Sequence, residues 1–356
     1  MEKLKKNKKK TDIYFFRLYQ KNIKQLQKFI DKHWQKNHIF AIDEKVFNWQ
    51  YKRNGIYNFF IAKKGNNLIG VQGLIPLNHF DKNLKTKQIF LTFWRVIEGK
   101  HVGIGFKLQK KIYKKYKPEF IGVVGAHKKV HSFFKWQGFT VKKMNHHVVI
   151  SKNAKEFKIA KVNKFKVLYK KYIKNLSLVN INSKNIKSLL NNKFYNVQKP
   201  LKTNNYIINR YLKHPFYKYL VFLIMNKKKP KALMIIRPVK IDKSLVLRFV
   251  DFIGTSESFL YTYHASNLLL DRYKAEYVDI YSYGIPKKIF KKAGYTDRYV
   301  EKDMIIPSNF EPFERKNVDI FCAFKTNFSN KEIKLFKGDG DGDRPNALAE
   351  QNYKFL

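Results

Sequence analysis

Cysteine is almost absent from this sequence of 356 residues, which contains only Cys322. A single thiol excludes a disulfide framework and a metal site built from cysteines, and it fits a reducing compartment. Acidic residues are also few, because 26 Asp+Glu stand against 74 Lys+Arg, for a formal net charge of +48. Only ten of the basic residues are arginines, although the arginine fork is the better ligand for phosphates and base edges.

The excess of lysine has two interpretations. Lys, Asn, Ile, Phe and Tyr have AT-rich codons and are all abundant here, so a low-GC genome would raise the lysine content everywhere. The alternative is a surface that binds nucleic acid or an acidic membrane, which requires a basic face. Under either interpretation the surface field favours anionic ligands, including phosphorylated cofactors and sugars.

Long apolar runs are missing as well. A membrane span needs about 20 predominantly apolar residues, whereas the best run, Tyr219 to Met225, has the length of a buried strand. The basic N-terminus has no following apolar core of a signal peptide. We therefore expect a cytoplasmic protein, whose lysines could contact the inner membrane surface. With 44% hydrophobic and 16% aromatic residues, the chain can bury a core.

The pattern of elements occurs twice. In each copy a hairpin and a long strand lead to a glycine, a helix, a strand and a short helix that ends at a second glycine. The two glycines are Gly99 and Gly138 in the first copy, and Gly254 and Gly294 in the second. The predicted organisation is one unit over residues 1–155, a second over 165–306, and a C-terminal appendage over 307–356.

The most informative segment runs from Val96 to Leu108, where a buried strand enters a glycine loop and then a helix. The first N–H groups of a helix lack intrahelical partners and, with the helix dipole, form a site for an anion such as a pyrophosphate. Gly103 and Gly105 would let phosphates approach the backbone, and Lys100 would add a charge. The segment is neither a dinucleotide fingerprint nor a P-loop, and a plain strand–helix turn is the common alternative.

Together with the order of elements, Lys100-His101-Val102-Gly103-Ile104-Gly105 resembles the pyrophosphate loop of the GNAT superfamily of acyl-CoA N-acyltransferases. The resemblance covers residues 10–150 and implies a mixed α/β fold of two tandem GNAT-like domains, each a mostly antiparallel sheet flanked by helices. It also implies acyl-CoA as co-substrate, without a metal. Residues expected at the cofactor are Val96 and Ile97 for the pantetheine arm, and Lys100, His101, Val102, Gly103, Ile104 and Gly105 for the pyrophosphate.

The second copy resembles the same fold without the glycine loop that would bind the pyrophosphate. Gly254-Thr255-Ser256-Glu257 offers no second glycine, and Glu257 places a negative charge where phosphate would bind. We expect this half to shape an acceptor cleft. Tandem repeats of this kind resemble FemAB-like aminoacyltransferases and acyltransferases of surface-polysaccharide biosynthesis.

Catalysis in this superfamily needs a base for the amine and an acid or oxyanion donor for the thioester. Glu98 at the strand end is the first candidate base, through a water or directly, and His127 is the second; the alternatives are a solvated carboxylate and a surface histidine. The family's usual general acid is a tyrosine, and this sequence has Phe134 at that position. Tyr113 or Tyr116 could serve as the acid instead, or the thiolate leaves without a proton donor.

The candidates for binding the acceptor substrate are polar and aromatic residues between the first helix and the hairpin. Tryptophan faces stack on sugar rings, and histidine and arginine bind hydroxyls or phosphate; the alternative is an aromatic core. The Asp-rich tail has the spacing of an EF-hand loop from Asp339 to Glu350, but Arg344 replaces the required glycine, which favours a polar tail that folds over the site or binds a partner. The acceptor candidates are His33, Trp34, His38 and Arg53.

The sequence therefore predicts an N-acyltransferase that moves an acetyl or related group from acyl-CoA to an amino group. The expected acceptor is a nucleotide-linked amino sugar for a surface polysaccharide. One alternative is a FemAB-like transferase that takes aminoacyl groups from tRNA, which predicts a continuous basic groove. The other is a basic nucleic-acid-binding protein on a degenerate GNAT scaffold.

Overall fold

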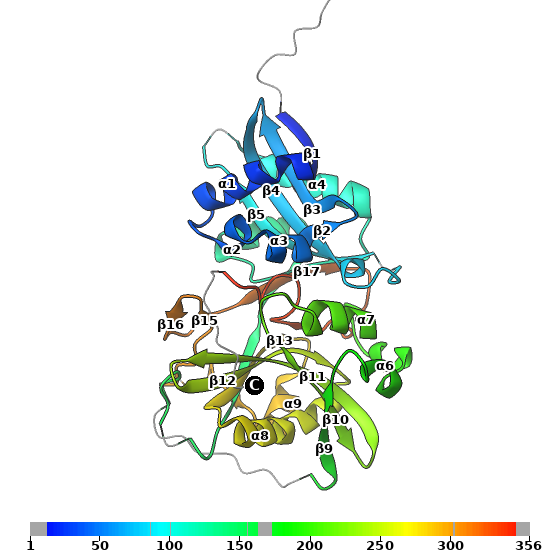
Figure 1. The fold of residues 1–356 in the computed structure, drawn as a ribbon, viewed down its shortest axis with the longest axis vertical. Coiled ribbons are helices and arrows are strands. Elements are labelled where there is room, and N and C mark those ends of the chain that lie inside the picture. The colour runs from blue at the N-terminus through cyan, green and yellow to red at the C-terminus, as the bar shows by residue number, and fades with distance from the viewer. Residues whose placement is uncertain are drawn as a thin grey trace, which may run out of the picture.

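The computed structural model describes residues 13–85, 87–99, 101–154, 156–162, 173–301 and 303–346. Two sheets lie one beyond the other along the long axis of the molecule, and helices flank each of them (Figure 1). Nearly all neighbouring strands are antiparallel. The expected mixed α/β fold with two mostly antiparallel sheets is confirmed.

The first sheet has the order β1-β3-β4-β5-β6-β17-β7, with β2 paired to β3. Residues of α1 to α3 belong to one buried apolar cluster and residues of α4 and α5 to another, so the sheet is covered on both faces. Its strands are β1 (Ile13–Tyr19), β2 (Lys52–Arg53), β3 (Ile56–Lys64), β4 (Asn67–Pro76), β5 (Gln88–Val96), β6 (Phe120–Val124), β7 (Thr140–Lys143) and β17 (Phe321–Thr326). Its helices are α1 (Ile23–His33), α2 (Ile39–Ile42), α3 (Glu44–Tyr51), α4 (Ile104–Tyr116) and α5 (His131–Trp136).

The amphipathic pattern of α4 fixes its position on this sheet. Ile104, Leu108 and Ile112 recur at helical spacing and are buried against β3, β4 and β5, while the intervening lysines are exposed. The helix begins directly after the glycine loop, as the sequence predicts. Consequently the N-terminus of α4 lies beside the end of β5.

The second sheet has the order β14-β8-β13-β12-β11-β10-β9, with β18 paired to β13. It repeats the hairpin, long strand, helix and parallel strand of the first sheet. Its strands are β8 (Asn145–Ile150), β9 (Leu176–Ile181), β10 (Leu220–Asn226), β11 (Lys229–Ile241), β12 (Ser244–Ile253), β13 (Tyr277–Tyr283), β14 (Thr296–Asp297) and β18 (Leu335–Phe336). The other elements are α6 (Ile186–Leu189), α7 (Asn204–Ile207), α8 (Thr262–Tyr273), α9 (Lys287–Ala293) and a hairpin of β15 (Asn309–Phe310) and β16 (Phe313–Glu314).

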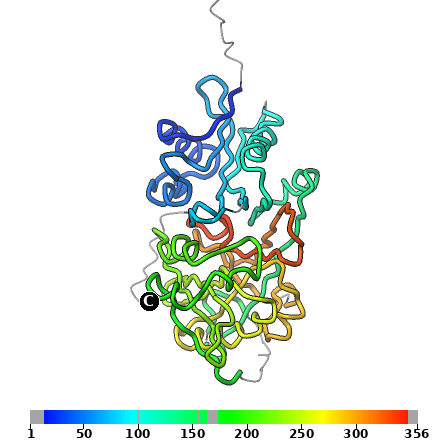
Figure 2. The backbone as a smooth tube through the Cα atoms, turned by 90° about the vertical axis from the view of Figure 1, so that its right-hand side faces the viewer, coloured from blue at the N-terminus to red at the C-terminus, as the bar shows by residue number. Residues whose placement is uncertain are grey.

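The chain exchanges strands between the two sheets. Strand β8, from the stretch expected to form the first unit, pairs with β13, and β17, from the C-terminal stretch, lies between β6 and β7. The expected appendage over 307–356 is therefore corrected for its described residues, which form parts of both sheets because their apolar side chains are buried there. Figure 2 shows this orange and red stretch between the two halves.

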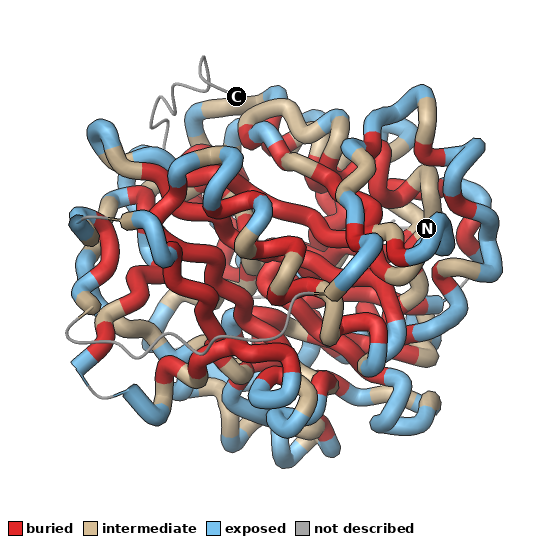
Figure 3. The backbone as a smooth tube through the Cα atoms, turned by 90° about the horizontal axis from the view of Figure 1, so that it is seen from below, coloured by how far each residue is buried: buried red, intermediate tan, exposed pale blue. Residues whose placement is uncertain are grey.

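One of the buried apolar clusters spans the two halves. One apolar cluster contains Phe47 and Phe90 from the first half, Val221 and Val250 from the second, and Ile333 from the C-terminal stretch. Figure 3 shows buried stretches of the backbone in the middle of the molecule and exposed stretches around them. The junction of the two halves is thus part of the core.

Candidate functional site

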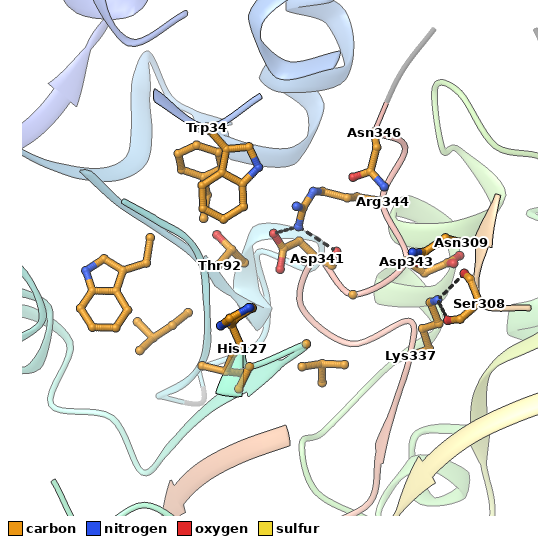
Figure 4. Close-up of a pocket in the computed structure, with 18 of the residues that line it drawn as sticks. Trp34, Thr92, His127, Ser308, Asn309, Lys337, Asp341, Asp343, Arg344 and Asn346 are labelled. Atoms are coloured by element: carbon orange, nitrogen blue, oxygen red, sulfur yellow. Dashed lines mark hydrogen bonds and ion pairs between the residues drawn. The ribbon is translucent and has the colours of Figure 1, made fainter. Parts of the chain in front are cut away.

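Strands β5 and β6 pair only briefly and then separate. The parallel register has three pairs, from Gln88↔Phe120 to Phe90↔Gly122, although β5 continues to Val96. Beyond Phe90 no described strand pairs with the edge of β5 that faces β6. A cavity of about 330 Å³ opens at this splay, and its lining includes Leu91 to Trp94 of β5 and Val123 to His127 at the end of β6. Figure 4 shows Thr92 and His127 on the same wall.

The loop after β5 leads into an uncapped helix N-terminus. Gly103 has a φ of 80°, in the left-handed region, and its carbonyl accepts from the Lys107 N–H at 3.0 Å. No described side chain caps α4 at this end. The Ile104 N–H donates to the His101 carbonyl at 3.4 Å, which leaves the next N–H groups of the first turn for an anion. Val102 and Gly103 are exposed and His101 is partly exposed at the mouth, whereas Lys100 lies outside the described residues.

Gly105 has a packing role that the sequence did not indicate. A Cβ at this position would lie 2.5 Å from Cζ2 of Trp94, so the indole rests directly on the glycine backbone. Ile104 is buried in the core beside it. Gly105 therefore brings α4 close to β5, while Gly103 is the glycine at the surface.

The residues expected along the pantetheine arm are tied to β4 rather than to the cavity. Val96 pairs with Gly70, and the Ile97 N–H donates to the Ile69 carbonyl at 2.9 Å. Neither residue lines the cavity, whose β5 wall begins at Leu91 and ends at Trp94. They lie between the cavity and the loop.

The three catalytic candidates lie in different places. His127 lines the cavity, and its Nδ1 accepts from the Lys129 N–H at 3.2 Å. Glu98 is exposed, lies 3.5 Å from Arg95, and does not line the cavity. Tyr113 lies on α4 away from the cavity; burial raises the pKa of its hydroxyl to about 12, and no described group hydrogen-bonds it. Phe134, which replaces the family's tyrosine, does line the cavity.

Of the four acceptor candidates, Trp34 alone lines the cavity, where it is 40% exposed and its ring lies 4.3 Å from that of Phe93. His33 packs beside Phe29 at the end of α1. His38 is buried, and its Nδ1 accepts from the Phe40 N–H at 3.1 Å as the cap of α2. Arg53 donates to the Asn78 carbonyl at 2.6 Å. His33, His38 and Arg53 are thus not brought to the cavity.

The far wall of the cavity comes from residues that the site prediction missed. The tail contributes an ion pair between Arg344 and Asp341, and a second pair joins Asp343 to Arg237 of β11 at 3.1 Å. The expectation of a polar tail over the site was the available signal, because the Asp-rich segment is the part that reaches the cavity. The wall residues are Tyr217, Arg237, Ser308, Asn309, Phe310, Glu311, Lys337, Asp341, Gly342, Asp343, Arg344 and Asn346.

Lys337 is a buried basic group in the cavity wall. Its Nζ donates to the carbonyl and the hydroxyl of Ser308 at 3.2 and 3.0 Å. Burial, reinforced by the nearby guanidinium of Arg248, holds the pKa of Lys337 well below its usual range. In Figure 4 this amine lies across the cavity from His127.

The corresponding splay of the second sheet is filled by the chain itself. Strands β12 and β13 also share three parallel pairs. Beyond them, β18 pairs with β13, and the Gly338 N–H donates to the Val250 carbonyl at 2.7 Å. Lys334 Nζ donates to the carbonyl of Gly254 at 2.6 Å, at the position of the second glycine loop. Only the first splay is therefore open in the part of the chain that the structure describes.

The described residues contain neither a cluster of metal-ligating side chains nor a membrane-spanning helix. No group of three or more His, Cys, Asp and Glu side chains there could hold a metal ion. The helices of the same residues include none that is long and apolar enough to cross a membrane.

Comparison with known proteins identifies the fold. No protein-family model matches the chain, and no curated protein matches it significantly in sequence. A GCN5-related N-acetyltransferase from Anabaena variabilis superposes with a TM-score of 0.55 at 12% identity, over 88% of this chain and 73% of its own. One from Kribbella flavida gives 0.52 at 8% identity, over 88% and 71%. A probable N-acyltransferase from Enterococcus faecalis gives 0.53 at 6% identity, over 89% and 73%. The chain has the fold of GCN5-related N-acetyltransferases.

Proposed function

We propose that the protein is an N-acyltransferase that uses acyl-CoA. The observation that carries the proposal is the open splay between β5 and β6, whose cavity is lined by Trp94, the residue that packs on Gly105 in the first turn of α4. The pyrophosphate would bind the first N–H groups of α4 around Gly103. The pantetheine arm would pair with the free edge of β5 from Leu91 to Trp94, which brings the thioester beside His127.

The hydrogen bond to His127 suggests how this residue acts. Because Nδ1 accepts from the Lys129 N–H, the neutral ring carries its proton on Nε2. An Nε2–H group is a donor, suited to the thioester oxygen, which becomes negative when the amine attacks. The base would then be Lys337, since a lysine with a lowered pKa can accept the proton of the acceptor's ammonium group.

We extend the proposal to an amino-sugar acceptor, as expected for a nucleotide-linked sugar of polysaccharide biosynthesis. The exposed face of Trp34 supplies an aromatic surface for a sugar ring. The amides of Asn309 and Asn346 and the guanidinium of Arg344 supply donors for hydroxyl or phosphate oxygens on the same wall.

A thermal-shift experiment with acetyl-CoA tests the proposal. A ligand that binds only the folded state increases the free energy of unfolding, by about 2.7 kcal/mol at a ligand concentration of 100 times the dissociation constant. The melting temperature rises accordingly. Gly103→Asp should abolish the shift, because a carboxylate would occupy the anion site. Gly103→Asn is the matched control, since it has the same shape without the charge and asparagine tolerates positive φ. If wild type shows no shift, or both variants keep it, the proposed site is wrong.

A further inference from the structure

Large apolar side chains are exposed at the mouth of the splay. Val102 is 94% exposed, Trp136 69% and Phe106 37%. The rings of Phe106 and Trp136 lie 5.3 Å apart, and both contact Phe133, which packs at 5.2 Å on the cavity residue Trp94. An aromatic cluster therefore runs from the cavity wall to the surface. Exposed apolar groups of this kind mark interaction sites.

The segment that carries this surface, residues 99–150, is strongly basic and contains no arginine. Residues 99–150 include twelve lysines and a single carboxylate, Glu119. Lys107, Lys110 and Lys135 are exposed next to Phe106 and Trp136 along α4 and α5, and none of them forms an ion pair with a described carboxylate. We define the α4–α5 surface as Val102, Phe106, Lys107, Lys110, Lys135 and Trp136.

The second copy provides an internal comparison. Its helix α9 corresponds to α5, with Lys291 and Lys292 where α5 has Lys135 and Trp136. The splay beside α9 is filled by β18. The exposed tryptophan is thus found beside the open splay, and a lysine takes its place beside the closed one. This difference associates Trp136 with the use of the splay rather than with the fold.

We infer that the α4–α5 surface docks a small acidic carrier protein, which presents the acyl group as a thioester on a phosphopantetheine arm. The inference rests on the proposed function and specifies its donor. The arm would enter the splay past Gly103, where its phosphate meets the N-terminus of α4. The acceptor nitrogen attacks the carbonyl carbon, the C–N bond forms and the C–S bond breaks. The thiol stays on the carrier, and the amine loses one proton as the thiolate gains one.

Charge and composition favour a protein over RNA as the occupant. An acidic face is complementary to the unpaired lysines, which would steer its association. Aromatic residues with a polar rim are typical of protein interfaces. RNA recognition relies on arginine for stacking and for forked contacts, and residues 99–150 have none.

Binding of a labelled carrier protein tests the inference directly. The probe is a small acidic acyl carrier protein, with its arm either absent or acetylated, followed by fluorescence anisotropy at low salt. We expect Lys107→Glu/Lys110→Glu/Lys135→Glu and Trp136→Ala each to weaken binding of both forms at least tenfold. The matched control is Lys288→Glu/Lys291→Glu/Lys292→Glu on α9, which removes the same charge and should leave the dissociation constant unchanged.

The outcomes separate this inference from the proposed function. No binding of either carrier form, or equal weakening by the α4–α5 and α9 variants, overturns the docking surface. Binding of RNA or of anionic vesicles that the α4–α5 variants abolish, while the carrier is not bound, also overturns it. Acetyl-CoA stabilisation that persists in these cases leaves the acyltransferase proposal intact. Conversely, carrier binding without any acetyl-CoA shift that depends on Gly103 would support docking and contradict the proposed cofactor site.

Discussion

At the scale of single residues, the contact between Gly105 and Trp94 determines the shape of the cavity. The indole occupies the space that a Cβ of residue 105 would need, with 2.5 Å between the two positions. Because Trp94 also lines the cavity, any side chain at 105 must displace a wall of the site. A glycine in a helix normally lowers stability relative to alanine, so here its packing role outweighs its conformational cost.

Gly105→Ala should therefore lower the free energy of unfolding by about 1–3 kcal/mol, the range for overpacked cores, and weaken the acetyl-CoA shift. Chemical denaturation and thermal shift measure the two effects. In a Trp94→Phe background, which lacks the clashing indole atoms, the same substitution should have little effect. An equal loss in both backgrounds would show that the indole is not the source of the strain.

His38 links stability to pH although it is not at the site. Burial lowers the pKa of its imidazole from 6.5 to about 3 in the folded state, reinforced by the nearby Arg344. Below pH 6.5 the unfolded chain binds a proton that the folded chain does not, so stability falls with pH down to about pH 3. At pH 5 this group should lower the unfolding free energy by about 2 kcal/mol.

His38→Asn isolates that contribution, because asparagine can also cap α2 and does not titrate. Urea unfolding at pH 7 and pH 5 should show a smaller acid loss in the variant, by about 2 kcal/mol. The other buried histidines are present in both proteins and cancel in the comparison. The same loss in both proteins would mean that His38 is protonated in the folded state at pH 5.

The sequence located the glycine loop and two cavity residues, Trp34 and His127, because a strand end and a helix start can be read locally. It missed that His38 caps α2 locally, through the N–H of Phe40, and it could not assign Arg53, whose partner is the carbonyl of Asn78, 25 positions later. Whether a polar side chain faces a cavity or a backbone carbonyl depends on packing between elements. The acceptor wall was missed for the same reason, since Arg237 and Asp343 are 106 positions apart in the chain.

At the scale of elements, the C-terminal strand β18 and the residues after it decide which splay is open. Lys202 holds this segment in place, with its Nζ 2.5 Å from Asp251 of β12 and 3.0 Å from Asp339 after β18. All three side chains are buried. Because the same segment continues into the cavity wall at Asp341 and Asp343, closing the second splay also builds the first site.

Lys202→Met should lower the unfolding free energy by about 3–5 kcal/mol, because it leaves two buried carboxylates without a cation. Hydrogen exchange should report faster exchange at Phe336 and Gly338, whose N–H groups are bonded in this segment. Adding Asp339→Asn should recover part of the loss by removing one of the unpaired charges. If hydrogen exchange at these two amides is unchanged in Lys202→Met, the ion pairs of Lys202 do not hold this segment against β12.

At the scale of the whole molecule, the repeated order of elements was predictable but the exchange of strands was not. Hydrophobic periodicity predicts a strand at β8, whereas the stretch that contains β17 was expected to be an appendage. Nothing local states which sheet either segment joins. β8 is continuous in sequence with the first copy and pairs with β13 of the second, about 130 residues later. A unit boundary drawn where the repeat pattern ends therefore cuts through both sheets.

Because strands are exchanged between the two sheets, we expect that neither half folds independently of the other. A fragment of residues 1–155 would lack β17, which pairs with both β6 and β7, and would leave β8 without its partner β13. Unpaired edges of this kind favour aggregation. We expect the fragment to show no cooperative thermal transition and poor dispersion in its NMR spectrum, and to gain both when co-produced with residues 156–356. Joining residues 317–330 to the fragment through a flexible linker should restore β17 and part of the transition. A cooperative transition of the unassisted fragment would instead mean that the first sheet is stable without β17.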